Sequence, residues 1–132
     1  MPELVMAEPH RILILEDDGF IGWHLADELE AAGFAVAGPF ISTSEALEYL
    51  AREIPAAAIV DVMLRDGACD AVGDLLESRG IPFLVHSATN PRDPGGSLEA
   101  APWFGKPRKA ADLIKALVAI LPAADAPASP RP

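Results

Sequence analysis

Short, continuous apolar runs recur along the chain, and two of them end abruptly in acidic residues. They lie at residues 11–15 (RILIL), 34–38 (FAVAG), 56–60 (AAAIV) and 81–85 (IPFLV). Runs without alternation are typical of strands buried on both faces of a parallel sheet. A further run at 101–104 (APWF) predicts a fifth strand.

Between these runs, apolar residues recur every three or four positions, which predicts amphipathic helices. The helices are expected at residues 19–32, 42–53, 69–79 and 110–121, and the second opens on the capping box Ser42-Thr-Ser-Glu45. Strands that alternate with helices imply right-handed crossovers and helices on both faces of the sheet. The predicted fold class is therefore α/β, with a doubly wound, five-stranded parallel sheet.

Three segments depart from this rhythm. Residues 89–102 hold three prolines and two adjacent glycines, so a fourth helix there is expected to be stunted. Residues 1–9 are expected to form a loose leader, and the Pro- and Ala-rich residues 122–132 a disordered tail. One domain is thus predicted over residues 10–121.

Composition narrows the class of protein. The 132 residues suit one domain, and the net charge of −10 argues against binding to nucleic acid or to an anionic membrane. The single cysteine, Cys69, excludes an internal disulfide and fits a reducing cytoplasm. His24 and His86 have no second histidine or cysteine at ligand spacing, so they predict helix and strand positions rather than a metal site. We expect a cytoplasmic protein.

Reactive side chains gather where the predicted strands end. Residues 16–18 (EDD) follow the first strand, Asp61 the third and Ser87 the fourth, while Lys106 comes after the fifth. Ligands of open parallel sheets bind at the carboxyl ends of the strands. Converging carboxylates repel one another, and their hard oxygen atoms favour Mg²⁺. A carboxylate, a hydroxyl, an ammonium and Mg²⁺ together suit phosphoryl transfer to an aspartate.

Four segments carry a resemblance to a known family: ILILEDD, AAAIVDVML, IPFLVHSA and WFGKP. In this order, over about residues 11–121, the chain resembles the receiver domains of two-component response regulators. It is most similar to the single-domain, chemotaxis-regulator-like members. The resemblance implies a flavodoxin-like receiver fold. It also implies a signalling switch that catalyses its own phosphorylation and dephosphorylation, rather than an enzyme acting on a separate substrate.

Carried over residue by residue, the resemblance assigns an acceptor and a metal site. Asp61 matches the phosphoacceptor. Glu16 and Asp17 match the acid pair beside Mg²⁺, with Asp17 binding directly and Glu16 through water. The backbone carbonyl of Met63 matches the third protein ligand. Asp18, by contrast, is expected only to cap the following helix.

The same resemblance assigns residues around the acceptor. Ser87 matches the switch Ser/Thr, and Lys106 matches the lysine that neutralises the phosphoryl group. Pro107 matches the proline that follows this lysine, usually through a cis bond. Trp103 stands at the aromatic switch position.

The implied function is acceptance of a phosphoryl group from a histidine kinase or a histidine phosphotransfer protein. Phosphorylation would switch binding to an unidentified downstream protein, or the domain would act as a phosphate sink or relay. One alternative is a pseudo-receiver, an interaction domain that works without phosphorylation. Another is a haloacid dehalogenase-type hydrolase, which needs a second aspartate two residues after the nucleophile, where this chain has Met63.

Overall fold

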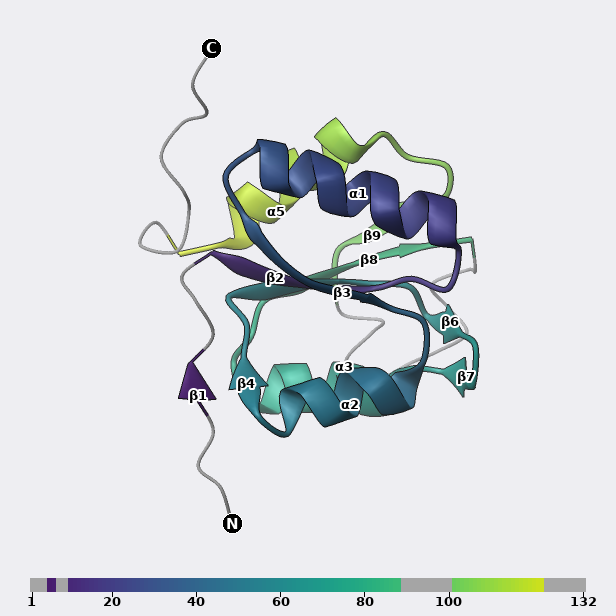
Figure 1. Ribbon diagram of the computed structural model, residues 1–132, viewed down its shortest axis with the longest axis vertical. Helices are drawn as coiled ribbons and strands as arrows, with labels where there is room; N and C mark the ends of the chain where they lie inside the picture. Colours follow the sequence, from purple (N-terminus) through teal and green to yellow (C-terminus); the bar gives the residue numbers. More distant parts are fainter. Residues whose placement is uncertain (1–4, 7–9, 89–100, 123–132) are drawn as a thin grey trace.

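A five-stranded, all-parallel sheet lies at the centre of the molecule (Figure 1). The computed structural model describes residues 5–6, 10–88 and 101–122. Strands lie in the order β3-β2-β5-β8-β9, so the chain crosses from one side of β2 to the other. Their bounds are β2 Arg11–Leu15, β3 Ala35–Phe40, β5 Ala57–Val60, β8 Phe83–Ser87 and β9 Trp103–Gly105.

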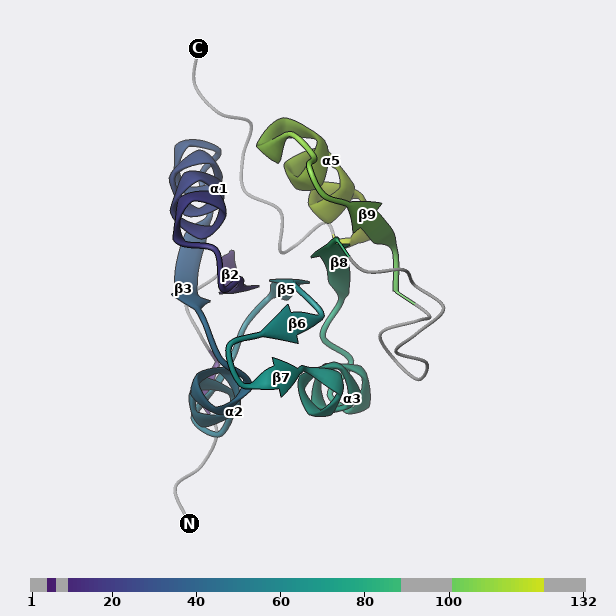
Figure 2. The same cartoon turned by 90° about the vertical axis from the view of Figure 1, so that its right-hand side faces the viewer.

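Helices cover both faces of this sheet. Figure 2 shows α1 and α5 on one side of the strands and α2 and α3 on the other. This arrangement confirms the predicted doubly wound α/β fold class. The bounds are α1 Gly19–Ala31, α2 Thr43–Leu50, α3 Asp70–Ser78 and α5 Ala110–Ile120.

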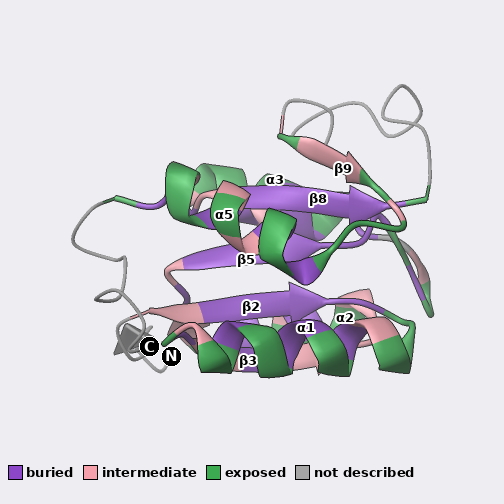
Figure 3. Cartoon of the chain, turned by 90° about the horizontal axis from the view of Figure 1, so that it is seen from above, coloured by how far each residue is buried: buried purple, intermediate pink, exposed green. Residues whose placement is uncertain are grey.

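The central strands are buried on both faces, which explains their unbroken apolar runs (Figure 3). Successive side chains of a strand point to opposite faces. In β2, Leu13 packs with the α2 and α3 side, whereas Ile12 and Ile14 pack with α1 and α5. Each such side chain contributes about 1.5–3 kcal/mol on burial. The two apolar layers therefore hold the carboxyl ends of these strands, and the side chains that follow them, in a fixed place.

The starts of α1 and α2 are fixed by side-chain caps. Asp18 Oδ1 accepts hydrogen bonds from the backbone N–H groups of residues 20 and 21, at 3.0 and 3.1 Å, as expected for a capping residue. Ser42 Oγ accepts from the backbone N–H of Glu45, which confirms the predicted cap. Asp66, from a loop after β5, also accepts from the first turn of α2 and ties that loop down.

Four short strands were not predicted. Strands β1 (Val5–Met6) and β4 (Glu53–Ile54) pair in parallel, and β6 (Met63–Leu64) and β7 (Gly67–Ala68) form an antiparallel hairpin. The second helix ends at Leu50 rather than near residue 53, and two residues of the expected leader, Val5 and Met6, form β1. Two residues are too few for a hydrophobic period to be recognised.

Three expectations fall largely on parts of the chain outside the described residues. They concern the stunted fourth helix expected at 89–102, the tail expected at 122–132 and the leader expected at 1–9, of which the structure describes only residues 5–6, 101–102 and 122. Within the described residues, no helix combines the length and the apolar character needed to cross a membrane.

Candidate functional site

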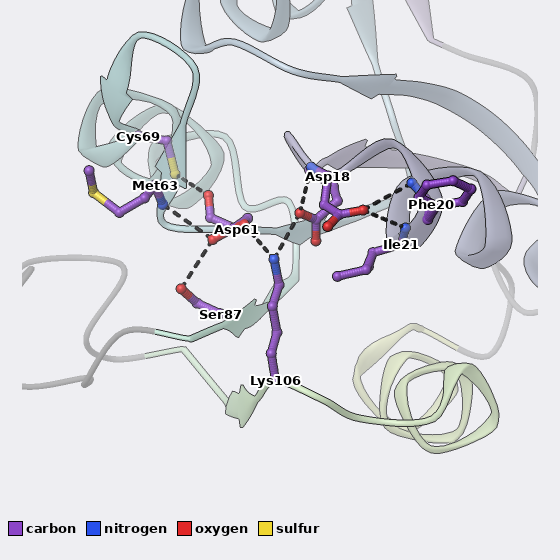
Figure 4. A network of polar contacts seen from close by, with 9 residues as sticks. Asp18, Phe20, Ile21, Asp61, Met63, Cys69, Ser87 and Lys106 are labelled. Carbon is purple, nitrogen blue, oxygen red and sulfur yellow. Dashed lines mark hydrogen bonds and ion pairs between the residues drawn. The ribbon is translucent and has the colours of Figure 1, made fainter.

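The carboxyl ends of four neighbouring strands bring together the polar residues expected there. Glu16 directly follows β2 and Asp61 directly follows β5, while Ser87 is the last residue of β8 and Lys106 directly follows β9. Strands β2 and β5 flank the point where the chain changes direction across the sheet, which is where ligands of such folds bind. Figure 4 shows the resulting network of side chains.

Asp61 lies at the centre of this network and is 5% exposed. Its Oδ2 lies 2.7 Å from Nζ of Lys106. Its Oδ1 accepts hydrogen bonds from the hydroxyl of Ser87 at 3.1 Å and from the backbone N–H of Met63 at 3.2 Å. The thiol of Cys69 donates to the backbone carbonyl of Asp61 at 3.0 Å. Both the carboxylate and its backbone are therefore held in one orientation.

Glu16 is the second buried acid and is 3% exposed. Its Oε2 accepts from Nζ of Lys106 at 2.8 Å and from the backbone N–H of Asp18 at 3.1 Å. Burial raises the pKa of Glu16 to about 7, although both hydrogen bonds act in the opposite direction. The folded protein thus opposes full ionisation of this carboxyl near neutral pH.

Lys106 bridges the two acids. Burial by itself would lower the pKa of Lys106, but the hydrogen bonds and negative charges of Asp61 and Glu16 outweigh that effect and raise it. The backbone N–H of Lys106 donates to the carbonyl of Ser87 at 3.1 Å, which fixes where the side chain starts. The Lys106–Pro107 peptide bond is cis, as the resemblance implied.

The acids can also hold a cation. Carboxylate oxygens of Glu16, Asp17 and Asp61 all lie within 4.8 Å of one another, and Asp17 is exposed. Three carboxylates there face the single ammonium of Lys106, so negative charge is in excess. Oxygen ligands and an open side toward water are what Mg²⁺ requires. The donor set therefore fits the ion expected from the sequence, whereas Asp18 is engaged in capping α1.

Two of the expected residues lie at the margin of the network. Met63 begins the hairpin strand β6 and is 46% exposed, and its backbone N–H donates to Oδ1 of Asp61. Trp103 lies on β9 opposite Val85 and packs, half-buried, against the α2 and α3 side of the core. Through this pairing Trp103 is joined to β8, the strand whose last residue is Ser87.

Cys69 was not recognised from the sequence as a neighbour of the site. Cys69 is eight residues after Asp61, and the hairpin β6–β7 between them brings its thiol back to the Asp61 carbonyl. Gly67 is the one residue in the sequence that indicates this hairpin. Gly67 has a φ of +113°, a conformation that favours glycine in tight turns. Burial raises the pKa of the Cys69 thiol to about 12, so it stays protonated and serves as a donor.

Comparison with known proteins gives a relative in sequence. The chain matches no protein-family model. It is 33% identical, over 116 residues, to the transcriptional regulatory protein PdtaR of Mycobacterium tuberculosis. That match covers 84% of this chain and 56% of PdtaR, so the chain spans little more than half the length of the curated relatives it matches.

Solved structures extend the likeness over nearly the whole chain. The REC domain of the PhyR response regulator from Erythrobacter litoralis has a TM-score of 0.71 at 23% identity, covering 92% of this chain and 96% of that one. The BeF3-activated conformation of SdrG from Pseudomonas melonis has a TM-score of 0.67 at 32% identity. In that case the match covers 86% of this chain and 97% of the other.

Proposed function

This chain belongs to the receiver domains of two-component response regulators, and we propose that it accepts a phosphoryl group on Asp61 with the help of Mg²⁺. The observation that carries the proposal is the position of Asp61. Its carboxylate is buried between the ammonium of Lys106 and the hydroxyl of Ser87, with two further acids in reach of a shared cation. The SdrG relative, solved in a BeF3-activated conformation, supports it.

In this proposal Asp61 is the nucleophile. One of its carboxylate oxygens forms a bond to phosphorus, and the bond from phosphorus to the donor atom breaks. The electron pair of that bond leaves with the donor, which is the imidazole nitrogen of a phosphohistidine or the carboxylate oxygen of acetyl phosphate. The hydrogen bonds from Met63 and Ser87 orient the attacking group before the donor arrives, which lowers the entropic part of the barrier.

Positive charge is the second requirement of the transfer. Glu16, Asp17, Asp61 and the backbone carbonyl of Met63 would hold Mg²⁺. The bound ion would supply charge that stabilises the oxygens of the transferring group. Lys106 supplies a further charge from the chain itself, because its Nζ lies 2.7 Å from Asp61 and is already oriented toward the acceptor.

Switching would follow from the same contacts. Ser87 now donates to the Asp61 carboxylate. Phosphorylation would convert that carboxylate into an acyl phosphate and move the negative charge to the phosphoryl oxygens, which would become the charged acceptor for the hydroxyl. Movement of Ser87 at the end of β8 would reach β9, where Trp103 is paired with the same strand. We propose that repacking of Trp103 changes the surface offered to a downstream protein.

The implied partners are a histidine kinase or a histidine phosphotransfer protein as donor and an unidentified downstream protein as target. A phosphate sink or relay would use the same chemistry without a downstream target. In either case residues 10–121 would form the receiver unit.

Intact mass spectrometry tests the proposal directly. The chain is incubated with acetyl phosphate and Mg²⁺, beside Asp61→Asn and a control, Asp27→Asn, which alters an exposed aspartate on α1 outside the acid cluster. We expect one added phosphoryl group on the parent and on Asp27→Asn, and none on Asp61→Asn or with EDTA.

Two results would overturn it. An adduct of equal yield on Asp61→Asn would show that another residue is the acceptor. No adduct on the parent, together with a melting temperature that Mg²⁺ leaves unchanged, would favour the pseudo-receiver, an interaction domain that no longer takes phosphate.

A further inference from the structure

A pocket of about 460 Å³ lies between the starts of α1 and α5. Figure 2 shows these two helices on the side of the sheet away from α2 and α3. Its volume falls within the range of small-molecule sites. Phe20 and Leu25 from α1 and Leu113 from α5 form apolar walls, and none of the clustered carboxylates lines it. The pocket is therefore distinct from the acid site, although Arg108 on its wall follows Lys106 closely in the sequence.

His86 gives this apolar pocket a polar point. Alternation along β8 directs Ser87 toward Asp61 and places His86, one residue earlier, on the α1 and α5 side. The histidine is 4% exposed, and neither ring nitrogen has a hydrogen-bond partner among the described residues. Burial, together with the charge of Lys106, lowers the pKa of His86, so the ring is neutral and offers one donor and one acceptor.

A buried polar group without a partner destabilises a fold, and such groups are rare enough to require an explanation. A ligand that enters the pocket with a hydroxyl or similar group would provide the missing partner for His86. The surrounding apolar walls would then bury the ligand's hydrocarbon part. Small-molecule sites are usually lined in this way, with mostly apolar side chains and a few polar groups that orient the ligand.

The mouth of the pocket is positive. Arg108 lines it, with its guanidinium stacked 5.3 Å from the ring centre of Phe104, and within the described part of the chain it forms no ion pair. Helix α5 begins beside it, and its N-cap, Lys109, makes no side-chain capping bond. Asp112 in the first turn does not line the pocket. An arginine and an open helix N-terminus both favour a carboxylate.

We propose that this pocket binds a small aromatic carboxylate that also carries a hydroxyl group, with the ring between α1 and α5, the hydroxyl on His86 and the carboxylate at Arg108. None of the three residues that contact the Asp61 carboxylate lines this pocket.

NMR titration of the ¹⁵N-labelled chain tests it with 4-hydroxyphenylacetate as the probe. Phenylacetate lacks the hydroxyl, and N-acetyltyrosinamide lacks the carboxylate but mimics a tyrosine of a partner protein. We expect saturable shifts confined to α1, β8 and the start of α5. Both analogues and the variants His86→Leu and Arg108→Gln should bind about tenfold more weakly, the equivalent of 1.4 kcal/mol.

The variants are chosen so that folding does not decide the outcome. Arg108 is exposed, so Arg108→Gln leaves the core intact, and Arg52→Gln is a matched control on an exposed arginine after α2. Absence of saturable shifts, shifts elsewhere, or equal binding by parent and both variants would refute the site. If N-acetyltyrosinamide bound as tightly as 4-hydroxyphenylacetate, a partner's side chain would replace the small carboxylate as occupant.

Discussion

Replacing Glu16 by glutamine should remove much of the pH dependence of stability between about pH 5 and pH 8 in EDTA. Burial raises the pKa of this carboxyl from 4.5 to about 7 in the folded protein. In that range the folded state binds a proton that the unfolded chain has released. The stability linked to Glu16 is therefore fully present below pH 4.5 and is lost as the pH rises through 7.

The size of the effect follows from the shift in pKa. Each unit corresponds to about 1.4 kcal/mol, so the change from 4.5 to about 7 amounts to about 3 kcal/mol across the range. Glu16 is 3% exposed, so solvent screens this effect little. For a domain of this length, the loss corresponds to a fall in melting temperature of roughly 10 °C.

Thermal unfolding of the parent and of Glu16→Gln at a series of pH values measures this effect. It is the difference between the two curves of melting temperature against pH. Glu48→Gln makes the same substitution on α2, where the side chain is 74% exposed, and should leave the curve unchanged. Curves that stay parallel for the parent and Glu16→Gln would refute the reasoning. If the acids hold Mg²⁺ as proposed, saturating Mg²⁺ should flatten the parent's curve, because the cation offsets the buried charge.

Three further changes have expected outcomes. In the parent, Mg²⁺ at a hundredfold excess over its dissociation constant should stabilise the fold by about 2.7 kcal/mol, and Asp17→Asn should lose most of that in a melting experiment. Lys106→Met leaves buried acids unpaired, so urea unfolding in EDTA at pH 8 should show a loss of about 3–5 kcal/mol, and less at pH 5 where Glu16 is protonated; equal stability at pH 8 would contradict the bridging role. Gly38→Ala should cost about 1–3 kcal/mol, because φ is +103° and an added Cβ would lie 2.7 Å from backbone atoms, whereas Gly19→Ala, with open space around it, should be tolerated.

The core of the fold and the position of the acids could be predicted because one physical cause produces both. A strand buried on both faces must be apolar throughout, so β2 and β5 are visible as continuous runs. Parallel pairing then requires their carboxyl ends to meet at one edge. The first polar residues after the runs, Glu16 and Asp61, therefore had to be neighbours before any contact was known.

The contacts that tune the site could not be predicted in the same way. The hairpin of β6 and β7 has strands of two residues, too short for any period, yet it places Cys69 under the backbone of Asp61. The sequence likewise placed Lys106 near acids but could not show that it bridges two of them, because that depends on the spacing of β2, β5 and β9. His86 was assigned only to a strand, since the lack of partners depends on the helices packed over it.

The meeting of strand ends that makes the site predictable also buries its acidic residues, and burial of charge is unfavourable. Parallel strands deliver Glu16 and Asp61 to a place where both are at least nine-tenths buried, and a buried carboxylate is tolerated only with a compensating charge. The two acids share the single ammonium of Lys106, so its positive charge does not fully offset the cost of burying them. The pKa of Glu16 is therefore still raised by burial. Apolar residues at these two positions would avoid this cost. Proteins keep such unfavourable local choices mainly at functional sites, so the buried acids indicate a function. A divalent cation held by these acids, as proposed, would offset their negative charge, so the stability of this chain and its chemistry should respond to the same ion.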